Sequence, residues 1–196
     1  AEQGLVYRGL KPVFWCATCE TALADAEVEY EDHTSNSIYV RFPLRLDPNG
    51  VFAEAADSGL SPHAVIWTTT PWTLPANQAI AVNENLRYMV VKARKHGHLL
   101  VAESRLAVVV ELMGEHFKGI TSNIAGKSLV GSRYKTLPSF KDNQTSKPVV
   151  HADFVSPHAG TGLVHCAPGH GMEDYEALQP LISKGEVVVK APVDNS

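Results

Sequence analysis

The chain has 196 residues, of which 44% are hydrophobic, and its 17 basic and 21 acidic side chains give a formal net charge of −4. This length and hydrophobic content predict one medium domain with a continuous core over residues 1–196. The acidic balance argues against a module that holds RNA by charge alone. No apolar stretch approaches the roughly 20 residues that cross a bilayer, so we expect no membrane association.

Three cysteines are present, Cys16, Cys19 and Cys166. An odd number argues against a secreted disulfide scaffold and favours a reducing compartment. Cys16 and Cys19 have the two-residue spacer of half a zinc site, but a closed tetrahedral site needs four ligands. Two interpretations stay open: two ordinary thiols, or a site completed by sequence outside this chain. We expect the chain alone to hold no metal.

The first half of the chain is dominated by predicted strands. Residues 1–36 combine Gly, Pro and the cysteine pair with an alternating stretch near Tyr30, which indicates an extended ribbon. Runs rich in β-branched and aromatic residues then predict strands at Ser37–Phe42, His63–Thr69, Tyr88–Ala93 and His98–Ala102. Apolar residues at helical spacing, followed by Gly114, predict a helix over Glu103–Met113.

The second half is less regular. Residues 114–150 lack a clear period, so we expect loops with brief strands and an exposed loop tip at Lys141–Lys147. Acidic residues in a first turn favour a helix over Met172–Ser183. Pro180 is expected to end or kink this helix, and a last strand is predicted at Glu186–Lys190.

Many short strands with few helices predict an α+β domain, with a curved or closed, barrel-like sheet and a few peripheral helices. Residues 1–36 and about 185–196 are expected to be ribbons that connect this single domain to further chain.

The run WTTTPWTLPAN at residues 67–77 leaves a predicted strand and enters a proline-stiffened turn. It concentrates hydroxyl and amide groups, and its two prolines hold φ near about −65°, which lowers the entropy of keeping the segment still. Such a segment suits a pocket whose hydroxyls must be positioned in advance. A threonine-rich strand edge followed by a proline turn fits the pattern equally well.

The run GTGLVHCAPGHGMEDY at residues 160–175 brings two histidines and two acids close to a helix start, and its glycines let backbone approach a ligand. Taken singly, His165 could be a packed strand residue, His170 a loop residue and Asp174 a first-turn helix residue. No serine-hydrolase elbow, His-Glu-x-x-His motif or phosphate-binding loop is present. A Cys166 nucleophile beside His165 is disfavoured, because strand neighbours point to opposite faces.

Together these two runs closely resemble the paired signatures of the editing insertion, CP1, in class I aminoacyl-tRNA synthetases for isoleucine, valine and leucine. The run KPVFWCATCETALADAEVEY at residues 11–30 resembles the strand that joins this insertion to the catalytic body. The valine and leucine enzymes typically carry Arg where this chain has Thr70. That position and His165 are similar to the bacterial or organellar isoleucine enzymes, in which Cys166 is commonly Thr.

The resemblance implies that the domain hydrolyses valine from misacylated isoleucine tRNA with a positioned water and excludes isoleucine. Asp174 would hold the α-ammonium group of the amino acid. Thr69 and Thr70 would orient the ester and the water, and His165 would limit the space for the side chain. Substrate contacts are implied for Trp67, Thr68, Thr73, Asn77, Gly162 and His170.

The implied partners are the 3′ end of isoleucine tRNA carrying valine and the rest of the synthetase chain. The resemblance also implies a monomer in the bacterial cytoplasm or mitochondrial matrix, with no cofactor in this domain. Zinc would bind only in the full-length enzyme, where a second cysteine pair lies past Ser196. A freestanding aminoacyl-tRNA deacylase and a non-catalytic RNA-binding module remain alternatives, although the latter would need a basic, aromatic stripe.

Overall fold

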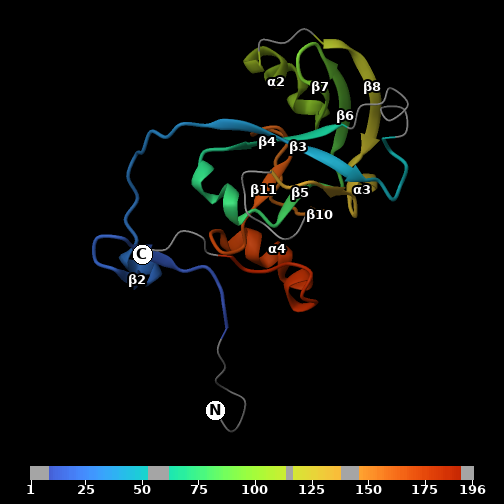
Figure 1. The fold of residues 1–196 in the computed structure, drawn as a ribbon. Helices are drawn as coiled ribbons and strands as arrows, with labels where there is room; N and C mark the ends of the chain where they lie inside the picture. Colours follow the sequence, from blue (N-terminus) through green and yellow to red (C-terminus); the bar gives the residue numbers. More distant parts are fainter. Residues whose placement is uncertain (1–8, 53–61, 114–116, 138–145, 191–196) are drawn as a thin grey trace.

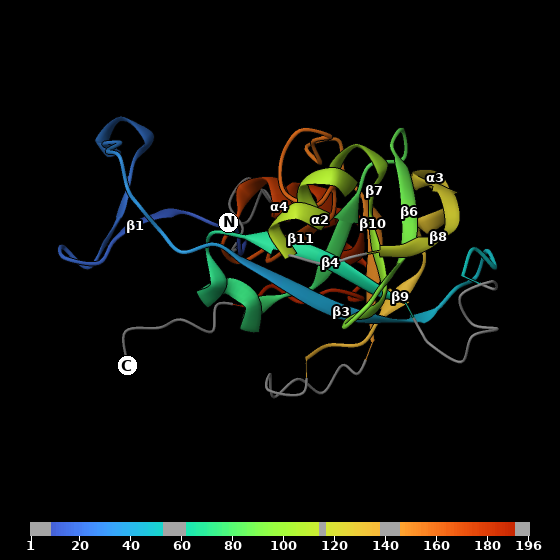
Figure 2. The same ribbon diagram turned by 90° about the horizontal axis from the view of Figure 1, so that it is seen from above.

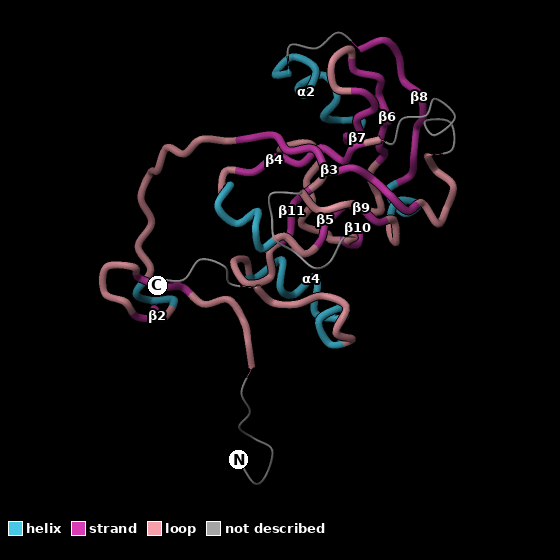
Figure 3. Tube along the Cα trace, viewed as in Figure 1, coloured by secondary structure: helices cyan, strands magenta, loops and turns pink. Residues whose placement is uncertain are grey.

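The computed structural model describes residues 9–52, 62–113, 117–137 and 146–190. Within these ranges one mixed sheet of nine strands has the order β11-β5-β10-β9-β3-β4-β7-β6-β8. The helices lie at the periphery of this sheet (Figures 1 and 3). The α+β class is therefore confirmed as a mixed sheet with few helices. Among the described strands the order is linear from β11 to β8, so the closed, barrel-like form is not confirmed.

An exposed hairpin precedes the main sheet and stands apart from it (Figures 1 and 2). Its antiparallel strands are β1 (Phe14–Cys16) and β2 (Thr21–Leu23), and a 3-10 turn, η1 (Asp25–Glu27), follows. Phe14 and Trp15 leave about half of their surface in solvent. The course from residue 9 to 36 is thus the extended ribbon that its composition predicts.

The four strands predicted in the first half are all present, as β3 (Ile38–Leu46), β4 (His63–Thr68), β6 (Arg87–Ala93) and β7 (Gly97–Ala102). β4 pairs antiparallel with β3 and parallel with β7. Alternation along β4 sends Ile66 into the main core and Val65 into a second cluster on the other face. The predicted helix covers this second cluster through Val109. It begins as η3 (Glu103–Arg105) and continues as α2 (Leu106–Met113).

Residues 114–150 are more regular than expected. They include β8 (Phe117–Ala125), α3 (Gly126–Leu129), β9 (Arg133–Tyr134) and β10 (Lys147–His151). The expectation of loops with brief strands is wrong for β8, which pairs with β6 along nearly its whole length. Register shifts in this pairing break the simple alternation that would reveal a strand in the sequence.

The sequence prediction also misplaces Lys147. Instead of lying at an exposed loop tip, it is fully buried in β10, where its Nζ donates a hydrogen bond to the backbone carbonyl of Asn77. Residues 138–145, which make up most of the expected tip, lie outside the described residues. A buried lysine requires such a partner, and a local pattern does not reveal it.

The third core cluster lies between the sheet and the C-terminal helix. β5 (Ala79–Val82) pairs with β10 and with β11 (Val164–Cys166), and α4 (Met172–Ser183) packs on this end of the sheet through Leu178. The bounds predicted for the helix are confirmed. Pro180 does not end it: the carbonyl of Glu176 loses its helical partner, but both residues are exposed, so water can replace that bond.

The strand predicted at Glu186–Lys190 is wrong, since no strand is present in this described segment. Gly185 adopts a φ of 72°, which turns the chain back onto the helix. The N–H groups of Glu186 and Val187 then donate to the carbonyl of Leu181 at 2.9 and 3.3 Å. Val187 is buried in the third cluster, so the segment caps α4. Separately, no helix among the described residues has the length and hydropathy needed to cross a membrane.

Candidate functional site

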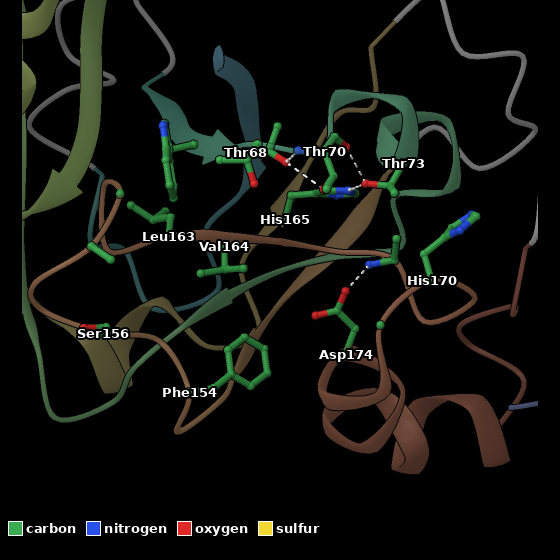
Figure 4. A pocket seen from close by; sticks show the side chains of 16 residues that line it. Thr68, Thr70, Thr73, Phe154, Ser156, Leu163, Val164, His165, His170 and Asp174 are labelled. Carbon is green, nitrogen blue, oxygen red and sulfur yellow. Dashed lines mark hydrogen bonds between the residues drawn. The ribbon is translucent and has the colours of Figure 1, made fainter. Parts of the chain in front are cut away.

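A cavity of about 340 Å³ lies where the end of β4, the 3-10 turn η2 (Pro71–Ala76), β11 and the start of α4 meet (Figure 4). Both segments singled out in the sequence contribute to its wall. A third segment, the loop between β10 and β11, completes the wall with Phe154, Ser156 and Ala159. The sequence contains no motif that would have identified this loop. The site residues predicted from sequence that line the cavity are Trp67, Thr68, Thr69, Thr70, Thr73, His165, His170 and Asp174.

The threonines are organised by short-range hydrogen bonds. The Oγ1 of Thr68, the last residue of β4, accepts a hydrogen bond from the backbone N–H of Thr70 at 3.1 Å and lies 3.3 Å from the Thr70 hydroxyl. Thr73 donates its hydroxyl proton to the carbonyl of Thr70 at 2.9 Å. The side chain of Thr69 makes no hydrogen bond to another described residue, so its hydroxyl is available to a ligand in the cavity.

The two glycines of the Gly-Thr-Gly run allow close packing behind the cavity. Gly160 has a φ of 57°, and a Cβ there would lie 3.2 Å from the Trp67 ring, so the indole packs directly against the Gly160 backbone. Gly162 has a φ of 77°, and a Cβ there would overlap the Cβ of Ala102. Gly162 was predicted to contact substrate, but it lies against the end of β7 and does not line the cavity.

His165 forms part of the cavity wall, although only 7% of its surface is exposed. Its Nε2 lies 2.9 Å from the Thr73 hydroxyl, and its Nδ1 lies 2.8 Å from Nδ2 of Asn77. Burial lowers its pKa to about 4, and the positive charges of Lys147 and His170 add to this effect. The imidazole is therefore neutral at pH 7.

Asp174, in the first turn of α4, is the carboxylate of the cavity. Its Oδ2 accepts a hydrogen bond from the backbone N–H of Ala167 at 2.8 Å. Its second oxygen points toward the space between Val164 and Phe154 (Figure 4). Burial raises its pKa, while hydrogen bonds from Ala167 and the Cys166 thiol oppose that rise.

Cys166 lies under the cavity floor and faces the third core cluster. It is fully buried, and burial together with the charge of Asp174 raises its thiol pKa well above the usual range. The thiol therefore stays protonated and faces away from His165, in agreement with the alternation expected along a strand. This geometry does not suit a cysteine nucleophile.

Asn77 and His170 were both predicted to contact substrate, but only His170 lines the cavity. Asn77 is buried and does not line the cavity; it contacts His165, Ala79 and Tyr134. His170 lies exposed at the rim, where desolvation lowers its pKa. It also borders a second cavity, of about 450 Å³, against the N-terminal ribbon.

Cys16 is the last residue of β1, and Cys19 lies in the turn that leads to β2. The backbone N–H of Cys19 donates to Sγ of Cys16 at 3.3 Å, and hydrogen bonds from Cys19 and Thr18 lower the pKa of Cys16. This turn presents two thiol ligands. Among the described residues no group of three or more His, Cys, Asp and Glu side chains is arranged to hold a metal. Two thiols are half of the four ligands that a tetrahedral zinc site needs.

The family model for tRNA synthetases class I (I, L, M and V) matches residues 1–179. The chain belongs to the class I aminoacyl-tRNA synthetases. Its relatives include the isoleucine–tRNA ligases of Symbiobacterium thermophilum, 45% identical over 91% of this chain, and of Desulforamulus reducens, 45% identical over 100% of it. These matches cover 18% and 19% of the relatives, so the chain spans about a fifth of the length of these curated synthetases.

Solved structures of synthetase editing domains share the fold. GlLeuRS-CP1 superposes with a TM-score of 0.64 at 18% identity, over 76% of this chain and 61% of that one. The editing domain of P. falciparum cytosolic leucyl-tRNA synthetase gives a TM-score of 0.60 at 13% identity, over 76% of this chain and 66% of that one. This class I synthetase segment therefore has the CP1 editing-domain fold.

Proposed function

We propose that this synthetase domain hydrolyses aminoacyl-tRNA, removing valine from isoleucine tRNA and leaving isoleucine in place. The observation that carries the proposal is the position of Asp174, a carboxylate held at one oxygen by Ala167 and open to the cavity at the other. An α-ammonium group is the natural counter-charge in such a partly desolvated place. The isoleucine–tRNA ligases among the relatives support isoleucine tRNA as the acceptor.

The chemistry assigned to the cavity is direct attack by water. The water oxygen adds to the ester carbonyl carbon, and the ester bond then breaks to release the amino acid and the ribose hydroxyl. The free hydroxyl of Thr69 is suited to orient the ester or the water. Cys166 is buried away from the cavity, and the Thr73 hydroxyl is already committed to the Thr70 carbonyl, so neither favours a covalent route.

Size selection is assigned to His165. Its ring is buried, carries hydrogen bonds on both nitrogens and contributes a wall of the cavity. A fixed wall rejects a longer side chain by overlap, and close-packed surroundings make that overlap costly. Valine, one methylene shorter than isoleucine, would fit where isoleucine does not. The roles proposed for Trp67, Thr68 and Thr70 are to shape and support the same cavity.

The proposed partners are the charged 3′ end of isoleucine tRNA and the remainder of the synthetase chain. The net charge of −4 supports this division, because the domain has little overall attraction for RNA and the rest of the synthetase would hold most of the tRNA. The proposal assigns no cofactor to the cavity.

The test is deacylation of three substrates under one set of conditions: valyl-tRNA, isoleucyl-tRNA and N-acetylvalyl-tRNA, all on isoleucine tRNA. We expect rapid loss of valine and slow loss of isoleucine. The N-acetylated ester should also resist hydrolysis, because it has no ammonium group for Asp174 to bind. Equal rates on the acetylated and free valyl esters would refute the assignment of Asp174. Absence of valyl-tRNA hydrolysis would refute the proposed function.

A further inference from the structure

A chain of buried hydrogen bonds runs beneath the cavity wall and joins the strands β9 and β11 to the 3-10 turn η2. Tyr134 on β9 donates its hydroxyl proton to Oδ1 of Asn77 at 2.5 Å. Asn77 meets Nδ1 of His165 at 2.8 Å, and Nε2 of His165 meets the Thr73 hydroxyl at 2.9 Å. All four side chains are buried. Neither Tyr134 nor Asn77 lines the cavity, so their hydrogen bonds reach a ligand only through His165.

The directions of these hydrogen bonds follow from one backbone carbonyl. Nδ2 of Asn77 lies 3.0 Å from the carbonyl of Ala79, which can only accept, so this atom must be the amide nitrogen. Its second proton then points at Nδ1 of His165, which must carry a lone pair. The imidazole proton therefore resides on Nε2.

The remaining hydrogen bonds agree with this direction. Nε2–H of His165 donates to the Thr73 hydroxyl, and that hydroxyl donates its own proton to the Thr70 carbonyl at 2.9 Å. The opposite tautomer would place an N–H against the N–H of Asn77, leaving two buried donors without acceptors, which is costly. Lys147 adds a fixed positive charge, which disfavours a second proton on His165.

We propose that Tyr134 is a positioning residue which, through Asn77, holds His165 as the neutral Nε2–H tautomer in a single ring orientation. His165 then presents a rigid wall and accepts no proton from the attacking water. This inference rests on the proposed function for its effect on selectivity, whereas the tautomer itself can be observed independently. Rejecting one extra methylene requires a wall that moves by less than the size of that group, which explains why a buried scaffold supports the imidazole.

The first experiment compares Tyr134→Phe with Tyr88→Phe. Both tyrosines are fully buried, and both donate to a protein oxygen, but the Tyr88 hydroxyl donates to the Gly162 carbonyl and accepts from the Asn83 N–H, so it is outside the hydrogen-bond chain of His165. The measured quantity is the rate of isoleucyl-tRNA hydrolysis relative to valyl-tRNA hydrolysis. We expect Tyr134→Phe to raise this ratio about tenfold. This lies within the roughly 10–200-fold discrimination that one methylene group can provide.

In Tyr88→Phe the ratio should stay at the wild-type value even if stability falls. A variant that is merely less stable loses both rates in proportion to its folded fraction, so the ratio separates positioning from general damage. An unchanged ratio in Tyr134→Phe, with valyl-tRNA still hydrolysed, would overturn the inference while leaving the proposed function intact.

The second experiment needs no catalysis. The protein is labelled with ¹⁵N-histidine, and the signals of His165 are identified by their loss in His165→Gln. At pH 7 we expect a protonated Nε2 and an unprotonated Nδ1 in the wild type. In Tyr134→Phe the Asn77 side chain keeps its contacts with Ala79 and His165 but loses one anchor, so we expect the His165 signals to broaden as the ring samples more than one orientation. An Nδ1–H tautomer or an imidazolium in the wild type would overturn the inference, whether or not Tyr134→Phe folds. If the wild type hydrolyses no ester, the proposed function fails and this spectrum still decides the tautomer.

Discussion

Oδ2 of Asp174 accepts a 2.8 Å hydrogen bond from the backbone N–H of Ala167, so the loop that follows β11 holds the carboxylate of the helix that comes after it. Burial raises the pKa of this carboxyl above its usual 3.8, which means that the folded protein binds the proton more tightly than the unfolded chain. The resulting stability is present below pH 3.8 and is lost as the pH rises through the raised pKa. At pH 7 the charged form therefore opposes folding.

Asp174→Asn should therefore raise the free energy of unfolding at pH 7 and lower valyl-tRNA hydrolysis. Asparagine keeps an acceptor for Ala167 but cannot pair with an ammonium group, a contact that contributes about 1.5–3 kcal/mol, or at least about tenfold in rate. Urea unfolding and deacylation assays measure the two effects. Glu173→Gln, at the exposed neighbouring acid, is the matched control for activity and should leave valyl-tRNA hydrolysis unchanged. A destabilised Asp174→Asn variant with full activity would refute both expectations.

Replacing His165 with alanine tests the proposed steric wall. If the ring excludes isoleucine by overlap, His165→Ala should begin to hydrolyse isoleucyl-tRNA while it still accepts valyl-tRNA. Deacylation of both charged tRNAs at one pH measures this change. A general base would give a different result, since its removal slows both reactions by typically 10²–10⁴-fold. A parallel loss, with no gain on isoleucyl-tRNA, would exclude the steric role.

His165 should also make stability depend on pH. Its pKa falls from 6.5 to about 4 on folding, so the stability it contributes is present above pH 6.5 and is lost as the pH falls toward 4. Between these values the wild type should lose about 3 kcal/mol more than His165→Gln, which cannot titrate. Urea unfolding at several pH values measures the difference, and the histidines that do not interact with His165 cancel because both proteins contain them. Parallel stability curves would contradict the burial of a neutral ring.

Gly162→Ala should be strongly destabilising for two separable reasons. A positive φ costs a side-chain-bearing residue about 1–2 kcal/mol, and overlap with Ala102 adds about 1–3 kcal/mol. Gly50→Ala is the matched control, because Gly50 has a φ of 65° with nothing within 4 Å of an added Cβ. It should show only the backbone cost. A double-mutant cycle with Ala102→Gly should recover the overlap cost alone; no coupling between the two sites would contradict the expected clash of Cβ atoms.

Zinc binding by the cysteine pair is a further prediction. Because Cys16 and Cys19 supply only two ligands and the described residues offer no third, we expect the purified protein to hold far less than one zinc per chain. Elemental analysis after dialysis against buffer without chelator gives the content. Size-exclusion chromatography identifies zinc shared between two chains. One tightly held zinc in a monomer would contradict this prediction.

The parts of the site that the sequence predicted are those carried by short contiguous runs. Thr68, Thr70 and Thr73 lie at and just after the end of one strand, and His165 and Asp174 flank one loop, so local spacing places the members of each run near one another. Only the family resemblance implied that the two runs share one site. Phe154, Tyr134 and Lys147 were missed because only long-range strand pairing brings them to the site. No local period distinguishes a lysine at a solvent-exposed tip from one whose charge is satisfied by a distant carbonyl.

The same limit explains the error after α4. Glu186–Lys190 places three β-branched valines between two charged residues, a composition that favours a strand, but no neighbouring strand among the described residues pairs with it. Instead, the N–H groups of Glu186 and Val187 donate to the carbonyl of Leu181. The Val187 side chain packs in the same core cluster as Leu178. Secondary structure that depends on a neighbour is therefore the part that composition predicts least well.

The hydrogen bond between Asn77 and His165 joins positions 88 residues apart, which bears on the order of events during synthesis. The strands β3, β4, β6 and β7 can emerge from the ribosome and pair while His165 has not yet been polymerised. Until it arrives, Asn77 lacks one of the acceptors on which its native orientation depends, and closing so long a loop is entropically costly. The selective wall is thus expected to be among the last features of the nascent domain to become rigid, after the core that supports it.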